Sequence, residues 1–346
     1  MTIDLAAVLP NLSNGLDGTG FLFGAGSSVE AGYPVMTDLT RTVVKALCPS
    51  DRATLDEALD AAASPYDETT GKPNVELLAD MVTAHAIKSH EDRFFVLEAL
   101  IRDLVTKVIL AVTSPRLDHH VRFLQLLKNR TYGRASCIYI FTTNYDVLFE
   151  LAAAEAGVAV ENGFIGSVER FFEPSRFATV SGVMQPNARF SEHAGLTIRL
   201  VKIHGSVSWY SHKGQFFERH PESIADAKKR VMVLPRRGKV METLQPPYDT
   251  LFRIMNQSLG KDCKYLASCG FSFGDDHINS NLIQPALISG KIKLFAFAEF
   301  ETSGMYAIKA LPTFSAGFAS SGISAGVPNT EGSNMWKFSQ FVELFA

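Results

Sequence analysis

The sequence predicts an α/β fold, in which a parallel β-sheet carries helices on both faces and receives a mostly helical insertion. Short apolar runs rich in β-branched and aromatic residues are typical of buried parallel strands. Four such runs end in polar or glycine-bearing motifs, as expected where an open sheet binds a ligand. Segments with apolar residues at three- and four-residue spacing predict the helices. These observations favour a Rossmann-like sheet in one domain over residues 1–346.

The chain enters the sheet through a strand, a glycine loop and a helix. The apolar run Phe21–Phe23 leads into Gly24–Ser27, and a helix is expected over Asp38–Leu47. Such a unit suits a pyrophosphate, because glycine admits a phosphate close to the backbone and helix N-termini are electropositive. The loop by itself is also compatible with a simple tight turn. A standard dinucleotide fingerprint has its third glycine where this chain has Val29, and the next glycine comes in Gly32–Pro34.

Residues 49–130 predict a helical insertion into the sheet. Three stretches carry apolar residues at helical spacing: Asp51–Ala63, Val75–Lys88 and Glu91–Val112. A fourth helix is expected over His119–Leu127. The insertion therefore separates the first strand from the second.

The second half of the chain predicts the remaining strands. They are expected at Cys137–Phe141, Leu196–Ile203, Tyr265–Cys269 and Lys291–Phe297. Between them we expect two helices, Val147–Ala156 and Tyr248–Leu259, and a hairpin over Trp209–Glu218. Residues 303–346 form an extension: Ser303–Asn334 predicts a long loop or an ordered meander, and Met335–Phe345 predicts a closing helix.

Three strands end in polar motifs that suit a nucleotide or a sugar, namely Thr142–Asp146, His204–Ser206 and Gly270–Asp275. Each also has an ordinary interpretation. Asparagine or aspartate can cap a helix, a single histidine is usually structural, and the third motif can cap a helix from His277 or Asn279. Because parallel strands end at one edge, an asparagine and a histidine there can flank one sugar, and the imidazole can accept a proton near neutral pH.

Taken together, four segments resemble the sirtuin family. They are the glycine loop with its Ala31–Pro34 ending, Thr142–Asp146, Lys202–Ser206 and Gly270–Ser272, in the family's order. The resemblance covers the core, whereas most of residues 49–130 and the tail lie outside it. It implies the NAD-binding fold of that family.

The departures from the family pattern concern the substrate. Sirtuin deacylases carry two cysteine pairs for zinc after the histidine motif, but Val207–Val240 contains no cysteine. Thr143 replaces a family glutamine, and Val35-Met36 replaces Phe-Arg. No zinc or other metal is therefore expected. The chain resembles instead the bacterial sirtuin-like NADases of antiphage systems, of which Gly270–Asn279 looks typical, and these cleave NAD with water.

The resemblance also implies a role for each site residue. Asn144 positions the ribose and the water, and His204 is the base, so these two residues are the expected catalytic pair. The expected NAD contacts come from Gly24, Ala25, Gly26, Ser27, Pro34, Thr143, Asp146, Gly270 and Ser272. Cleavage of the nicotinamide–ribose bond passes through an oxocarbenium-like sugar, as glycoside hydrolysis does. The protein mainly has to hold the ribose and admit one water.

The sequence thus predicts an NAD glycohydrolase that serves as the effector of an antiphage, abortive-infection system. Its activity has to be gated, and we expect a homo-oligomer or a partner, such as a HerA-type ATPase or another operon-encoded sensor. Two other functions remain open at this point. One is NAD-dependent deacylation or ADP-ribosyl transfer, and the other is a non-catalytic module that binds NAD or ADP-ribose.

Bulk properties limit the partners. The net charge of −3 does not favour direct nucleic-acid binding. No apolar run approaches the roughly 20 residues that span a bilayer, and no positively charged segment precedes Arg41, so we expect a cytoplasmic protein without a membrane partner.

Overall fold

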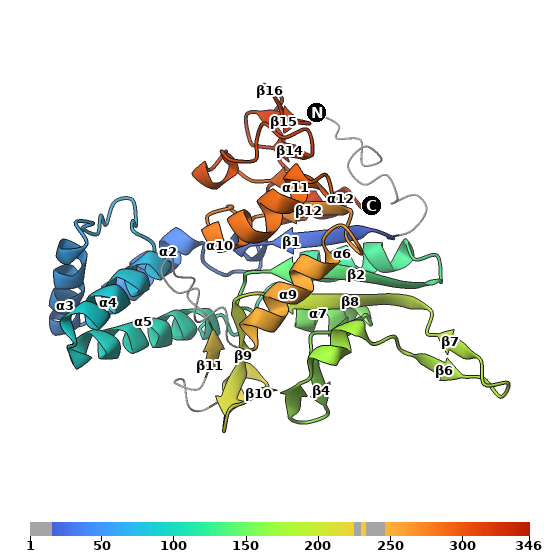
Figure 1. The fold of residues 1–346 in the computed structure, drawn as a ribbon, viewed down its shortest axis with the longest axis horizontal. Helices are drawn as coiled ribbons and strands as arrows, with labels where there is room; N and C mark the ends of the chain where they lie inside the picture. Colours follow the sequence, from blue (N-terminus) through green and yellow to red (C-terminus); the bar gives the residue numbers. More distant parts are fainter. Residues whose placement is uncertain (1–15, 225–229, 233–245) are drawn as a thin grey trace.

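A nine-stranded sheet forms the centre of the molecule in the computed structural model, which describes residues 16–224, 230–232 and 246–346 (Figure 1). The strand order is β16-β15-β14-β13-β12-β1-β2-β8-β3, and the pairs from β14 to β3 are parallel. The bounds are β1 Thr19–Phe23, β2 Ala135–Thr142, β3 Ala159–Glu161, β8 Gly195–Lys202, β12 Tyr265–Cys269, β13 Lys293–Phe297, β14 Phe314–Gly317, β15 Gly322–Ser324 and β16 Val327–Asn329. The predicted α/β fold with a parallel sheet is confirmed.

Alternate residues of the central strands belong to two different apolar cores, so both faces of the sheet are covered. Leu22 and Phe141 lie in one core, with side chains of α9 (Tyr248–Ser258), α10 (Asp276–Ile278), the π-turn η5 (Asn279–Ile283) and α11 (Gln284–Ile288). Phe21, Phe23 and Ile140 lie in the other, with α6 (Asp118–Asn129), α7 (Leu148–Ala156) and α12 (Phe338–Glu343). Burial on both faces explains why these strands are uniformly apolar.

The insertion is a separate helical layer beside the sheet (Figure 1, blue to cyan). Three of its four expected helices, α3 (Pro49–Ala61), α4 (Val75–Ser89) and α5 (Asp92–Leu110), pack with α2 (Met36–Lys45) into a third apolar core, whereas the fourth, α6, packs on the sheet. Tyr145 and Val207 from the sheet side also belong to this core. The helices stand close to the expected positions, although α2 begins two residues before Asp38.

A second, antiparallel sheet lies below the first in the view of Figure 1, in the order β11-β9-β10-β5-β4. Its strands are β4 Phe164–Gly166, β5 Arg170–Phe172, β9 Gly205–His212, β10 Gln215–Glu218 and β11 Arg230–Met232. The expected hairpin is β9–β10, whose turn residues Lys213 and Gly214 both have positive φ, as a type I′ turn requires. The short strands β3 to β5 were not predicted, because three residues carry too little of a hydrophobic pattern.

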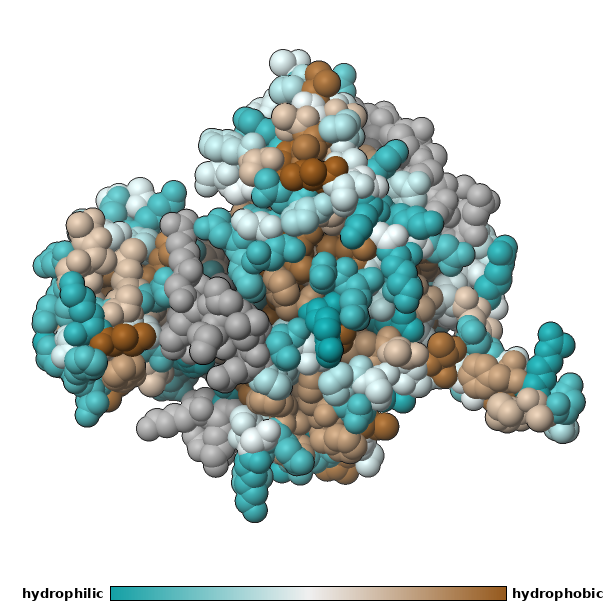
Figure 2. All heavy atoms as spheres, in the orientation of Figure 1, coloured by the Kyte–Doolittle hydropathy of each residue, from teal (hydrophilic) through white to brown (hydrophobic). Residues whose placement is uncertain are grey.

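A two-stranded hairpin of β6 (Gly182–Met184) and β7 (Phe190–Glu192) projects from the body of the molecule (Figures 1 and 2). Its side chains Val183, Met184 and Phe190 are exposed. Exposed apolar groups that gather on a projecting arm are typical of contact surfaces.

The C-terminal extension is ordered. Strands β14 to β16 form an antiparallel meander after the 3₁₀ turn η6 (Ser303–Met305), and so confirm the meander interpretation of the Gly/Ser/Ala-rich segment. The closing helix α12 is shorter than Met335–Phe345. None of the helices in the described ranges has both the length and the apolar character needed to cross a membrane.

His120 on α6 is a buried, neutral histidine whose replacement tests the packing of this extension. Its ring packs against those of Phe149 and Phe338, and neither ring nitrogen has a hydrogen-bond partner among the described residues. Burial and nearby His119 lower the pKa of His120 from 6.5 to about 3. Between pH 6.5 and about pH 3, His120 is therefore protonated in the unfolded chain but neutral in the native state. The free energy of unfolding consequently falls as the pH drops below 6.5.

We expect His120→Leu to raise the free energy of unfolding at pH 7 by roughly 1–3 kcal/mol, because it removes two unsatisfied polar atoms. The variant should also lose a pH dependence of about 1.4 kcal/mol per unit below pH 6.5. Urea denaturation at pH 5 and pH 7 measures both effects. His212→Gln, which removes an exposed imidazole, is the control, and equal pH dependence in His120→Leu and the wild type would contradict the expectation.

Candidate active site

The four sequence motifs follow four adjacent strands, β12, β1, β2 and β8. Phe23 pairs with Cys269 on one side and with Thr142 on the other, and Thr142 pairs with Lys202. Gly24, Gly270, Asn144 and His204 therefore stand one or two residues beyond matched positions of the sheet. After β1 the chain forms β2, β3 and β8 on one side of β1, and it later forms β12 to β16 on the other side. This topological switch point is where open α/β sheets bind their ligands.

The loops after β1 and β12 touch through glycine. The Gly26 amide donates to the Gly270 carbonyl at 3.0 Å, and a Cβ on Gly24 would lie 2.6 Å from that same oxygen. Gly270 has a φ of +66°, and its Cβ would lie 2.4 Å from the Ser27 nitrogen. The close contact between the two loops therefore requires glycine at positions 24 and 270, whether or not a phosphate binds there.

The glycine loop forms a single 3₁₀ turn, η1 (Ala25–Ser28), before the chain reaches α2. The amides of Gly26 and Ser27 donate within the protein, to Gly270 and Gly24, and the Ser27 hydroxyl also donates to the Gly24 carbonyl at 2.9 Å. Ser27 is fully buried, whereas Ala25 is half-buried. Ser27 therefore shapes the loop from inside, and Ala25 is placed at its surface.

Asn144 joins the loop after β2 to the glycine loop. Its side-chain nitrogen donates to the Gly24 carbonyl at 3.0 Å and to the Ser28 hydroxyl at 2.9 Å, and it also lies 3.3 Å from the Ser27 hydroxyl. No donor among the described residues occupies its carboxamide oxygen. Asn144 is thus held in one orientation, with an acceptor left for a ligand.

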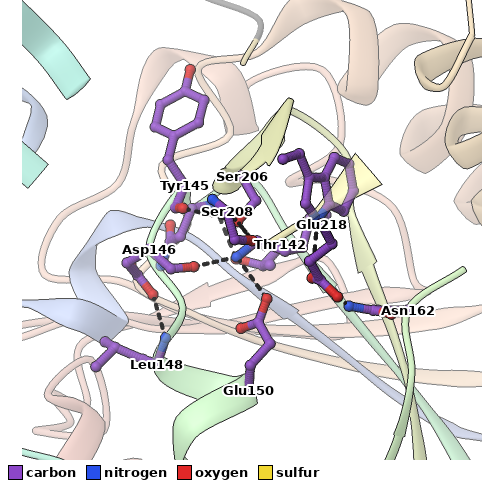
Figure 3. Close-up of polar contacts among 12 residues, drawn as sticks. Thr142, Tyr145, Asp146, Leu148, Glu150, Asn162, Ser206, Ser208 and Glu218 are labelled. Carbon is purple, nitrogen blue, oxygen red and sulfur yellow. Dashed lines mark hydrogen bonds and ion pairs between the residues drawn. The ribbon is translucent and has the colours of Figure 1, made fainter. Parts of the chain in front are cut away.

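Asp146 also links the glycine loop to the loop after β2. One carboxylate oxygen accepts from the Ser28 hydroxyl at 2.8 Å, and the other accepts from the Leu148 amide at 3.1 Å (Figure 3). The Asp146 carbonyl accepts from the buried ammonium group of Lys202, which also pairs with Glu150 at 3.0 Å. Burial raises the pKa of Glu150 and Lys202 partly offsets the rise. Asp146 therefore holds the glycine loop and the loop after β2 together.

His204 and Asp275 form a hydrogen-bonded pair. The distance from Nε2 of His204 to the Asp275 carboxylate is 2.8 Å, and both side chains are about nine-tenths buried. Burial alone lowers the pKa of His204, but the Asp275 hydrogen bond and charge, with the charge of Glu76, raise it overall. Burial likewise opposes ionisation of Asp275, yet His204 keeps the pKa of this carboxyl below its usual range.

Asp275 was predicted only as a helix cap, and it does accept from the amides of His277 and Ile278. Its second oxygen is the one that reaches His204. The sequence gives no signal of this contact, because 71 positions separate the two residues. The cap interpretation was therefore correct, and the partnership with His204 was missed.

The remaining predicted contacts lie around the same edge. The Thr143 amide donates to Phe23 of β1 at 3.3 Å, and Pro34 is half-buried after buried Tyr33. Ser272 is exposed, and its hydroxyl accepts from the Gly274 amide at 3.3 Å. Thr143 and Ser272 thus follow β2 and β12, the two strands that flank β1.

The C-terminal helix braces the glycine loop, which the sequence did not indicate. The carboxylate of Glu30 accepts from the Ser339 amide at 2.7 Å and from its hydroxyl at 2.8 Å, at the start of α12. A carboxylate at a helix N-terminus is electrostatically favourable. The extension therefore helps to hold the loop in place.

Comparison with known proteins adds a family to this geometry. Residues 139–302 match the family model of the SIR2-like domain, and no curated protein matches the chain. The match contains three of the four motifs and begins after the glycine loop. SIR2-like family members are NAD-dependent enzymes, so the match supports NAD binding. Within the described residues, no three His, Cys, Asp or Glu side chains are grouped as metal ligands.

Proposed function

We propose that this protein is an NAD glycohydrolase, which cleaves NAD with water to nicotinamide and ADP-ribose. The observation that carries the proposal is the site itself: Asn144 and the His204–Asp275 pair follow strands β2, β8 and β12, on either side of the switch-point strand β1. The SIR2-like match supports NAD as the ligand.

Each group has a chemical task in this proposal. The glycine loop receives the diphosphate at the end of β1, and the open oxygen of Asn144 accepts from a ribose hydroxyl or from the attacking water. With Asp275 holding the proton on Nε2 of His204, Nδ1 is the basic nitrogen that accepts a proton from either. Activity should therefore fall as the pH drops through the raised pKa of His204.

Water is the acceptor that the sequence favours. Sirtuin deacylases hold a zinc module beside the cleft for the acyl-lysine peptide, and its cysteine pairs are missing from Val207–Val240. Nicotinamide leaves as a neutral molecule from a cation, so the protein needs only to hold the ribose and admit one water.

We further propose a role as a gated effector in bacterial antiphage defence, acting in the cytoplasm. An NADase that is always active would deplete the NAD of its own cell, so self-association or a partner has to control its activity. A HerA-type ATPase or another sensor encoded in the same operon would fit this role. The exposed apolar arm of β6 and β7 is one surface available for such a contact.

The test is to incubate the full chain with NAD, alone and with the product of a neighbouring gene, and to measure nicotinamide and ADP-ribose by chromatography. We expect both products in equal amounts, and none from His204→Ala. His220→Ala, at an exposed position, should retain the activity. No turnover in either setting, or undiminished turnover in His204→Ala, would contradict the proposal. Tight NAD binding without cleavage would indicate a binding module instead.

A further inference from the structure

Two backbone hydrogen bonds join the loop after β2 to the loop after β8. The Ile203 amide donates to the Thr142 carbonyl at 2.9 Å, and the Val207 amide donates to the Tyr145 carbonyl at 3.0 Å. His204 lies between the two donating residues in the sequence. The position of His204 therefore depends on the loop after β2, which also carries the asparagine of the site.

Lys202 adds a side-chain contact between the same two loops. It is the last residue of β8 and is fully buried. Its ammonium group donates to the Asp146 carbonyl and, at 3.0 Å, to the carboxylate of Glu150 in the first turn of α7. A lysine side chain buried to this degree is rare unless it is paired. Lys202 thus ties the end of β8 to the loop after β2 and to the start of the helix that follows this loop.

The ion pair of Lys202 and Glu150 is a weak source of stability. A buried ammonium group and a buried carboxylate both lose their hydration, and apolar residues of similar volume often stabilise a fold equally well or better. Burial raises the pKa of Glu150 even with Lys202 beside it, so for this carboxyl group desolvation outweighs the attraction. The lysine is therefore better explained by the position in which it holds the loop than by the stability that it adds.

We propose that Lys202 is a positioning residue of the candidate site, which sets the spacing between Asn144 and His204. It does so by holding the Asp146 carbonyl, and Glu150 is its counter-ion. The carbonyl that it holds lies two residues after Asn144, and Lys202 itself stands two residues before His204. The inference rests on the proposed function for its meaning in catalysis, whereas the effect of Lys202 on the loop does not depend on that function. A displacement of about 1 Å in a group that acts on the ribose can cost roughly 100-fold in rate.

The test compares Lys202→Met with Lys128→Met. Methionine keeps an unbranched apolar side chain and removes the charge and its donors. Lys128 is the matched control, since its ammonium group also donates to two backbone carbonyls, those of Ala156 and Gly157 at the opposite end of α7. The double variant Lys202→Met/Glu150→Leu removes both charges, so no buried carboxylate is left without its partner. We expect the double variant to melt close to the wild-type Tm.

The first measurement concerns the loop and needs no turnover. The side-chain amide signals of Asn144 are recorded by NMR in the full chain without NAD, and are assigned by their absence in Asn144→Ala. We expect these signals to shift or broaden in Lys202→Met and in the double variant, and to keep their wild-type positions in Lys128→Met. Wild-type Asn144 signals in the double variant would overturn the inference.

NAD turnover gives the second measurement. We expect kcat to fall about 10- to 100-fold in Lys202→Met and to stay low in the double variant. KM for NAD should stay within about twofold, because the glycine loop is not altered. Lys128→Met should keep the wild-type kcat.

The double variant separates positioning from stability, and it carries both measurements if Lys202→Met does not fold. A wild-type kcat in the double variant would show that the pair serves the fold alone, and so would a double variant that cannot fold. Either result would overturn the inference. Changed Asn144 signals in a protein whose wild type never cleaves NAD would uphold the role of Lys202 and reject the proposed reaction.

Discussion

Asp275→Asn is expected to lower the rate of NAD cleavage about 100-fold or more while leaving the fold intact. Asparagine keeps the oxygen that caps the amides of His277 and Ile278, so the start of α10 survives. It loses the negative charge that raises the pKa of His204. Its amide also donates where the carboxylate accepted, which drives the imidazole proton to Nδ1 and removes the basic nitrogen from the substrate side.

This effect is measured as kcat and KM for NAD across pH, with thermal denaturation to show that the variant is folded. Asp118→Asn is the matched control, since it neutralises a carboxylate in the first turn of α6, away from the site. Turnover within about twofold of the wild type in folded Asp275→Asn would show that the His204–Asp275 contact is structural. A rise in KM alone would point to binding rather than to proton transfer.

Asn144→Ala is expected to reduce NAD cleavage about 100- to 1000-fold, because it removes both the open acceptor and the donor that fixes it. The substitution also leaves the Gly24 carbonyl and the Ser28 hydroxyl without this partner. We therefore expect a stability loss of roughly 1–3 kcal/mol as well. The assay has to run well below the unfolding transition of the variant.

Ser28→Ala separates the two effects. It removes one partner of Asn144 and the hydroxyl that Asp146 accepts from, but leaves the Asn144 carboxamide and its bond to Gly24. We expect a comparable loss of stability with most of the NAD cleavage retained. Full turnover in Asn144→Ala, or an equal loss in both variants at matched stability, would contradict a direct role for Asn144.

Local patterns were sufficient for most of the fold. The central strands are buried on both faces, so Phe21–Phe23 and Cys137–Phe141 are uniformly apolar, and the helices of the insertion show their period clearly. Hydrophobic patterns did not predict the short strands β3 to β5. These strands span three residues each, and β3 and β5 pair with strands farther along the chain.

The candidate site divides in the same way. Asn144 and His204 were predicted because each follows a strand, which in a parallel sheet already fixes a position in space, and because their motifs resemble those of the sirtuin family. The contact of Asp275 with His204 and the bracing of the glycine loop by Glu30 and Ser339 were not predicted. Side-chain hydrogen bonds between distant segments leave no periodic trace in a sequence.

The sequence alone determined that this chain forms an α/β sheet whose strands end in a glycine loop, an asparagine and a histidine, since strand composition and motif order are local properties. The tertiary structure alone decided which groups touch them. It sets Asp275 on His204 and Ser28 on Asp146. The physical reason is that proton affinity depends on distance and burial, and both are fixed only when segments far apart in the sequence pack together.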